Sequence, residues 1–168
     1  MQILSSGGDH VPQKTTIDRA KEDLREGKSP TTAAGEFVKD EIEHIRRGKH
    51  GARSTKQAIA IGLSEARRAG VPLPPPRKGT TSERTRRSAE LAYEEGQGER
   101  KPRAPSRRRS RAAEGALKRE PHAAASHASL SRQAKSAAAQ RRRRGRVTPG
   151  ARGKAGGRKR GGGKARRR

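Results

Sequence analysis

The sequence predicts an all-α fold, with a small helical module followed by a long, disordered, basic tail. Three observations support this prediction. Apolar residues in the first 99 positions recur at helical spacing between residues that favour helix ends. Only 27% of the residues are hydrophobic and 1% aromatic, so any packed core must be small. Residues 100–168 contain 25 Lys and Arg against two acids, whereas residues 1–99 are close to neutral, with 18 against 15.

Changes in composition divide the chain into five segments. The helical module follows a short N-terminus, and a proline-rich linker and a weak helix separate it from the tail. The predicted boundaries are 1–14 for the disordered N-terminus, 15–70 for the helical module, 71–79 for the Pro-rich linker, 80–96 for the weak helix and 97–168 for the disordered tail rich in Arg, Lys, Gly and Ala.

The first helix is expected over residues 16–26. Thr15 and Asp18 have the spacing of a capping box, and Gly27 favours a helix end. Its few apolar residues share one face: Ile17, Ala20 and Leu24.

The second helix, over residues 29–47, has the clearest pattern in the chain. Ser29-Pro30 places a proline at the first helical position, and Gly48 favours the end. The apolar residues follow helical spacing and predict an amphipathic helix: Ala34, Phe37, Val38, Ile42 and Ile45.

The third helix is expected over residues 54–69, with a capping box formed by Ser54 and Gln57 and an end at Gly70. Small residues on its apolar face would allow a close approach to the second helix. We expect this pair to be antiparallel or steeply crossed. The two helices could also provide a surface for self-association or for a protein partner, through the apolar residues Phe37, Val38, Ile42, Ile59 and Leu63.

Beyond the pair, Val71-Pro-Leu-Pro-Pro-Pro76 predicts an extended spacer. A weaker helix over 81–95 is indicated by Thr80 or Thr81 before Glu83. Within the tail, the Ala/Ser-rich residues 123–140 could become helical once their charges are neutralised.

The charge of the tail predicts a polyanionic partner. A flexible polycation binds phosphate backbones, releases their counterions and carries no device for reading bases. Stacking aromatics are absent from the tail, which argues against a single-strand reader. The candidate nucleic-acid contacts are Arg107, Arg108, Arg109, Arg111, Arg141, Arg142, Arg143, Arg144, Arg146, Lys154, Arg158, Lys159, Arg160, Lys164, Arg166, Arg167 and Arg168.

A second candidate is the basic turn before the third helix. Lys49, Arg53 and Lys56, together with free backbone amides at a helix start, could hold a phosphate. The alternative is an ordinary basic turn with a serine cap. The spacing of a Walker loop is absent.

No other site is indicated. The chain has no cysteine, and its histidines lack the spacing of metal ligands, so we expect no metal and no cofactor. His44 and His50 flank the end of the second helix, where a cation is favoured by the helix dipole. No nucleophile, base and orienting group can be assembled, so an enzyme is not expected. Without a signal peptide or an apolar run of membrane length, we expect a cytoplasmic, nucleoid-associated protein.

The stretch Gly27-Lys-Ser-Pro-Thr-Thr-Ala-Ala-Gly-Glu-Phe-Val38 and the run from Gly48 to Gly70, with its Ser-Thr-Lys-Gln-Ala-Ile-Ala-Ile-Gly-Leu-Ser-Glu-Ala-Arg core, resemble a family of small bacterial proteins of unknown function, often described as DNA-binding. The resemblance covers roughly residues 15–90. It implies a bacterial source and brings no catalytic residues. The tail is similar in composition to those of linker histones and bacterial histone-like proteins, although it prefers Arg to Lys.

These observations predict a histone-like or nucleoid-associated protein that binds DNA without sequence specificity. Two alternatives stay open: an RNA-binding or ribosome-associated protein, and a protein-interaction module that its tail anchors to nucleic acid. DNA is placed ahead of RNA as the partner, and no membrane is expected.

Overall fold

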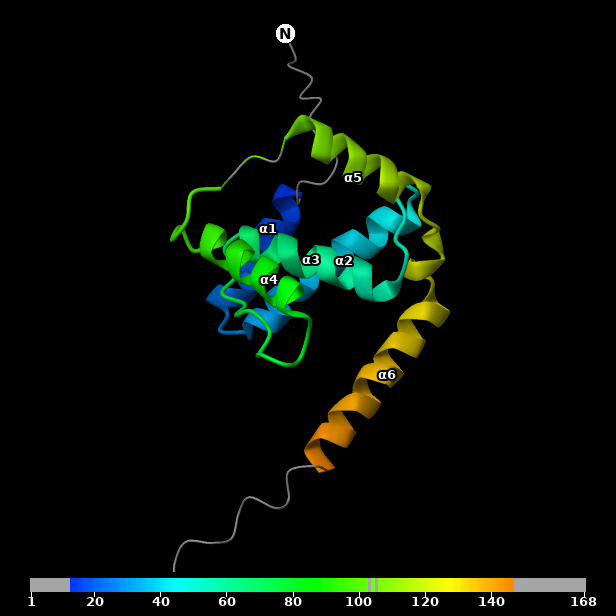
Figure 1. Ribbon diagram of the computed structural model, residues 1–168. Helices are drawn as coiled ribbons and strands as arrows, with labels where there is room; N and C mark the ends of the chain where they lie inside the picture. The colour runs from blue at the N-terminus through cyan, green and yellow to red at the C-terminus, as the bar shows by residue number, and fades with distance from the viewer. Residues whose placement is uncertain (1–12, 103, 105, 147–168) are drawn as a thin grey trace, which may run out of the picture. The chain divides into compact units, whose positions relative to one another are not determined.

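The structure is a computed structural model that describes residues 13–102, 104 and 106–146 (Figure 1). These residues form helices and no strand, which confirms the all-α class. No helix among them combines the length and apolar character that crossing a membrane requires. The elements are α1 (Lys14–Arg25), α2 (Pro30–Arg46), α3 (Thr55–Arg68), α4 (Glu83–Gly96), α5 (Arg107–Arg119), the 3-10 helix η1 (His122–Ala125) and α6 (His127–Arg146).

The chain divides into two compact units at Gln133. The first contains α1 to α5, η1 and the start of α6. The described part of the second consists of residues 134–146, the remainder of α6.

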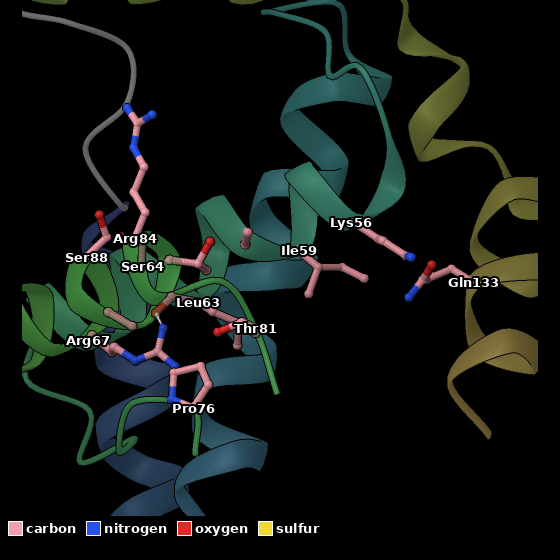
Figure 2. Close-up of a pocket in the computed structure, with 13 residues that line it drawn as sticks. Lys56, Ile59, Leu63, Ser64, Arg67, Pro76, Thr81, Arg84, Ser88 and Gln133 are labelled. Carbon is pink, nitrogen blue, oxygen red and sulfur yellow. Dashed lines mark hydrogen bonds between the residues drawn. The ribbon is translucent and has the colours of Figure 1, made fainter. Parts of the chain in front are cut away.

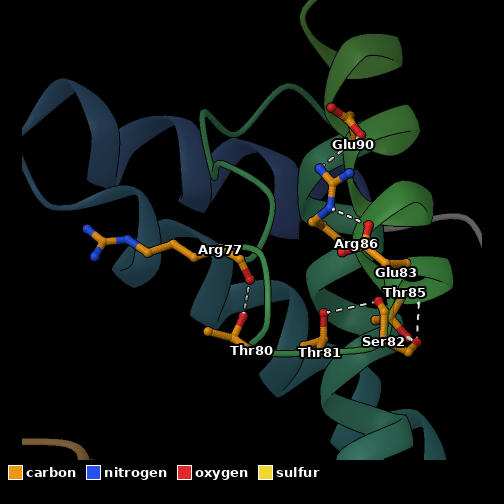
Figure 3. A network of polar contacts seen from close by, with 8 residues as sticks. All are labelled: Arg77, Thr80, Thr81, Ser82, Glu83, Thr85, Arg86 and Glu90. Carbon is orange, nitrogen blue, oxygen red and sulfur yellow. Dashed lines mark hydrogen bonds and ion pairs between the residues drawn. The ribbon is translucent and has the colours of Figure 1, made fainter.

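Local signals set most helix ends. The side chains of Ser29 and Ser54 accept hydrogen bonds from Thr32 N and Gln57 N, at 3.3 and 3.2 Å, as the sequence predicts. Helix α4 is capped by Ser82, which accepts from Thr85 N at 3.2 Å, and not by Thr80 or Thr81 (Figure 3). The predicted Thr15 cap is wrong, because α1 begins at Lys14, two residues before the predicted start, and Gln13 precedes it without a side-chain cap.

Two glycines end α2 and α3 as predicted. Gly48 has φ of 74° and Gly70 has φ of 90°, a left-handed conformation that closes a helix at little cost for glycine alone. Helix α4 continues through the predicted stop at Gly96, and the left-handed residue is Gly98, with φ of 77°.

The first core cluster joins α1, α2 and α3 to the proline-rich segment. Phe37 lies at its centre and is 1% exposed. Val71 and Leu73 are also buried there, so the predicted spacer contributes to the core. The guanidinium of Arg67 holds this segment in place by donating to the carbonyls of Leu73 and Pro74, at 3.2 and 3.5 Å. The buried members are Ala20, Ala33, Ala34, Phe37, Ala66, Val71 and Leu73.

Helices α2 and α3 approach closely, as their small residues predict. A Cβ placed on Gly62 would lie 2.7 Å from Val38 Cα and 3.0 Å from Phe37 O. Both neighbours are backbone atoms, so only glycine fits at this contact.

A second core cluster shows that the module extends well beyond residue 97. Ala124 and Ala125 of η1 are buried against Ile42, Ile45, Ala52 and Ala58, and Leu130 of α6 packs on the same cluster. Four hydrogen bonds attach this returning segment: Gly51 N to Leu117 O at 2.9 Å, Ala52 N to Pro121 O at 3.2 Å, Thr55 Oγ1 to Ala124 O at 2.7 Å and Arg46 Nε to Ala125 O at 2.9 Å.

The predicted disordered tail therefore starts too early, because residues 107–119, 122–125 and 127–146 are helical in the structure. Two serines start its helices: Ser106 accepts from Arg109 N at 3.4 Å, and Ser126 accepts from Ser129 N at 3.3 Å. Alanine-rich sequence sustains them. Residues 147–168, the rest of the predicted tail, lie outside the described residues.

Candidate nucleic-acid interface

Several cations between residues 13 and 100 are paired with nearby acids. Arg19 Nε lies 3.0 Å from a Glu36 oxygen, and Arg47 Nη2 lies 2.9 Å from Glu43. Arg86 lies between two carboxylates of its own helix, with Nε 3.0 Å from Glu83 and Nη1 3.4 Å from Glu90 (Figure 3). The further pairs are Arg25 with Glu22, Lys28 with Asp23 and Glu26, Arg68 with Glu95, and Arg100 with Glu94.

The first five residues of α5 differ from this pattern. They include four exposed arginines, and no ion pair joins any of them to an acid within the described ranges. The first turn of α5 contains no acid, and the ion pair of this helix, Lys118 with Glu114 at 2.7 Å, lies at its other end. The four residues are Arg107, Arg108, Arg109 and Arg111.

Helix α6 ends in a second run of arginine. Arg141, Arg142 and Arg143 are exposed, and the helix continues through Arg144 to Arg146. Cations near a helix C-terminus interact favourably with the helix dipole, so this end is stabilised by the same charges that make it basic. The other predicted contacts lie outside the described residues: Lys154, Arg158, Lys159, Arg160, Lys164, Arg166, Arg167 and Arg168.

Four backbone amides of the basic turn between α2 and α3 already have partners. Lys49 N donates to His44 O at 3.1 Å, Arg53 N donates to Gln57 Oε1 at 3.0 Å, and Gly51 N and Ala52 N bond the returning segment. The side chains of Lys49, Arg53 and Lys56 are exposed. Their role as phosphate contacts stays a prediction that rests on side-chain charge alone.

A groove of about 440 Å³ lies along α3 and α4 (Figure 2). Ile59, Leu63 and Ala89 give it apolar walls, and Lys56 and Arg84 add two cations. Of these apolar residues, Ile59 and Leu63 belong to the surface predicted for a partner. The predicted surface is wrong for Phe37 and Ile42, because these two side chains are buried in the chain's own cores.

Sequence reasoning missed a buried polar cluster formed by Glu41, His44 and His50, whose potential ligand atoms all lie within 4.8 Å of one another. Burial, followed by the charges of Glu65 and Asp40, raises the pKa of Glu41 to about 8. Burial lowers the pKa of His44, although the Asp40 carboxylate opposes this shift. The two histidines expected to place a cation at this helix end, His44 and His50, are both buried.

One signal in the sequence could have revealed this cluster. The helical spacing of Ala34, Phe37 and Ile45 defines the buried face of α2, and positions 41 and 44 fall on the same face. Polar residues at core positions need partners, so Glu41 and His44 on this face indicate a buried polar cluster.

Comparisons with known proteins give one match. Residues 25–78, from the end of α1 to the proline-rich segment, match a family of unknown function (DUF6496). The match includes α2, α3 and the buried cluster, and its description assigns no activity. No curated protein and no solved structure matches the chain.

Proposed function

We propose that this protein binds nucleic acid without sequence specificity, and duplex DNA in preference to RNA, through the arginines of α5, the arginines of α6 and the basic residues that follow. One observation supports this proposal above others. Four exposed arginines lie within the first five residues of α5, its first turn holds no acid, and none of the four has an ion pair within the described ranges. Unpaired guanidinium groups keep their full charge and their donors for phosphate.

The position of the arginines on α5 adds to this argument. The start of a helix has a partial positive charge, so four arginines there repel it and one another. A phosphate placed at this helix end would relieve both repulsions and could also accept from backbone amides. The first turn of α5 is therefore better suited to an anion-bound state than to a free one.

The same features explain the lack of sequence specificity. Arginines that contact phosphate position a protein on a duplex but do not identify bases. No aromatic residue occurs in positions 100–168, so bases of a single strand find no stacking platform there. Compaction of the chromosome in a bacterial nucleoid is the role that we infer from these properties.

Binding of the full-length protein to nucleic acid over a range of salt concentrations tests this function. We expect equal affinity for two duplexes of unrelated sequence, and a linear fall of log K with log salt, with a slope of about −0.9 for each phosphate contact. Tighter binding to structured RNA than to duplex DNA at the same salt would replace the DNA proposal with RNA binding. Binding that does not change with salt would refute both.

A further inference from the structure

The buried cluster of α2 and the loop that follows it is built from donors that bind transition metals. It combines one carboxylate, of Glu41, with the imidazoles of His44 and His50. The exposed fractions of these residues are 1%, 5% and 6%, so water does not solvate them freely. Two imidazoles and a carboxylate are a common zinc-binding set.

Glu41 provides an independent indication that a ligand belongs here. Both of its carboxylate oxygens are buried, and neither has a hydrogen-bond partner among the described residues. A carboxylate removed from water without donors is strongly unfavourable unless a cation or a proton compensates it. The nearest basic group with a recorded distance is His50 Nε2, at 3.6 Å from Glu41 Oε2, which is too long for a hydrogen bond.

The orientation of the His50 ring also supports a bound ligand. His50 Nδ1 lies 3.2 Å from Gly51 O, and because a carbonyl only accepts, Nδ1 must carry the proton in this contact. In the neutral ring, Nε2 then turns its lone pair toward the Glu41 carboxylate. Two acceptors that face each other need a positive species between them. A backbone carbonyl on the far ring nitrogen is also the usual second-shell partner of a metal-binding histidine.

We propose that Glu41, His44 and His50 bind one divalent transition-metal ion, with Zn²⁺ as the best match to the donor set. Tetrahedral zinc with ligand distances of about 2.0–2.1 Å requires donor atoms roughly 3.3 Å apart. Donor atoms that lie up to 4.8 Å apart must therefore move closer together when the ion binds. Asp40 Oδ1 lies 3.5 Å from His44 Nε2, so a second carboxylate faces this ring. Three protein ligands leave the fourth position to water.

Such an ion would be structural. It would fasten the C-terminal half of α2 to the loop that carries Gly51, and this loop bonds the returning segment through Gly51 N and Leu117 O. Metal binding should therefore raise the stability of the whole first unit.

The test titrates full-length protein, freed of metal with a chelator, with Zn²⁺ and with Co²⁺. We expect one ion per chain, visible Co²⁺ absorption bands of tetrahedral intensity, and a rise in Tm of about 10 °C when free Zn²⁺ is a hundredfold above Kd. If wild-type protein shows neither Co²⁺ bands nor a change in Tm, the proposal is overturned.

Two variants and one control assign the site. Glu41→Gln keeps the size of the side chain, and His50→Ala removes a ligand, so each should abolish the Tm rise and the Co²⁺ bands. The control replaces His122 and His127, both exposed, with alanine and should bind like wild type. Circular dichroism shows whether each variant folds. If a variant does not fold, the Co²⁺ spectrum of the wild-type protein still tests the proposal. Binding that survives Glu41→Gln but is lost in the control would show an adventitious ion at the exposed histidines and would refute the site.

Discussion

At Gly62 and Gly35 the same substitution should have opposite effects, although both residues lie within helices. A Cβ on Gly62 would lie 2.7 Å from Val38 Cα, whereas a Cβ on Gly35 would meet nothing within 4 Å. Replacing glycine by alanine in a helix gains up to about 1 kcal/mol, but overpacking a rigid contact costs about 1–3 kcal/mol. The backbone of α2 cannot move aside locally, so strain should dominate at Gly62.

We therefore predict that Gly62→Ala lowers the free energy of unfolding by about 1 kcal/mol or more, and that Gly35→Ala raises it by up to about 1 kcal/mol. Urea denaturation of both variants measures the difference. A stabilising Gly62→Ala would mean that α2 and α3 do not approach as closely as the structure places them.

Single residues also show which roles can be predicted from sequence patterns. Ser29, Ser54 and Gly70 act through neighbours three or four positions away, so their capping roles could be predicted from spacing alone. Glu41 and His50 could not be assigned in this way. Their burial depends on contacts between α2 and the following loop, and on exclusion of water by the second core cluster.

At the level of whole elements, the second core cluster depends on a segment far along the chain. Ala124 and Ala125 pack on α2 and α3, and hydrogen bonds from Gly51, Ala52, Thr55 and Arg46 hold them there. Composition predicts a disordered tail at these positions, because the high net charge of the whole tail outweighs the helical signal of a short alanine-rich stretch with serine caps. Alanine gives little periodic signal, so its docking site is visible only in three dimensions.

A fragment of residues 1–99 should accordingly be less stable than a fragment of residues 1–133. Four lost hydrogen bonds, each contributing about 0.5–1.5 kcal/mol, predict a loss of about 2–6 kcal/mol before the lost apolar contacts are included. Residues 1–133 should unfold like the first unit of the full chain, because the unit ends at Gln133. Equal midpoints in urea for 1–99 and 1–133 would contradict the docking of this segment.

Gly51→Ala offers a point variant for the same contact. A Cβ there would lie 1.8 Å from Glu120 O, so the returning segment would have to move. The variant should move the denaturation midpoint of the 1–133 fragment toward that of 1–99. Gly35→Ala in the same fragment is the control, and an unchanged midpoint for Gly51→Ala would count against this packing.

On the scale of the whole molecule, the cations differ both in where they lie along the chain and in whether an acid is paired with them. Acids before residue 100 pair with several of the cations around them, and residues 100–168 have two acids for 25 cations. The sequence predicted this asymmetry from counts. The structure adds that four of the unpaired arginines lie on a helix end where they repel the helix dipole. Such an arrangement favours a polyanionic ligand over the free state.

The most direct test of nucleic-acid binding through unpaired arginines is a comparison of two full-length variants. Each variant loses four positive charges. One replaces Arg107, Arg108, Arg109 and Arg111 with alanine. The other replaces Arg19, Arg25, Arg47 and Arg100, whose side chains are 53%, 69%, 63% and 52% exposed and paired with acids.

Binding of each variant to duplex DNA is measured across a range of salt concentrations. We predict that the α5 variant loses about 3 units from the slope of log K against log salt, and that the paired-arginine variant loses less than about 1. Equal losses in the two variants would show that total charge alone drives binding, and would contradict the assignment of the contacts to α5.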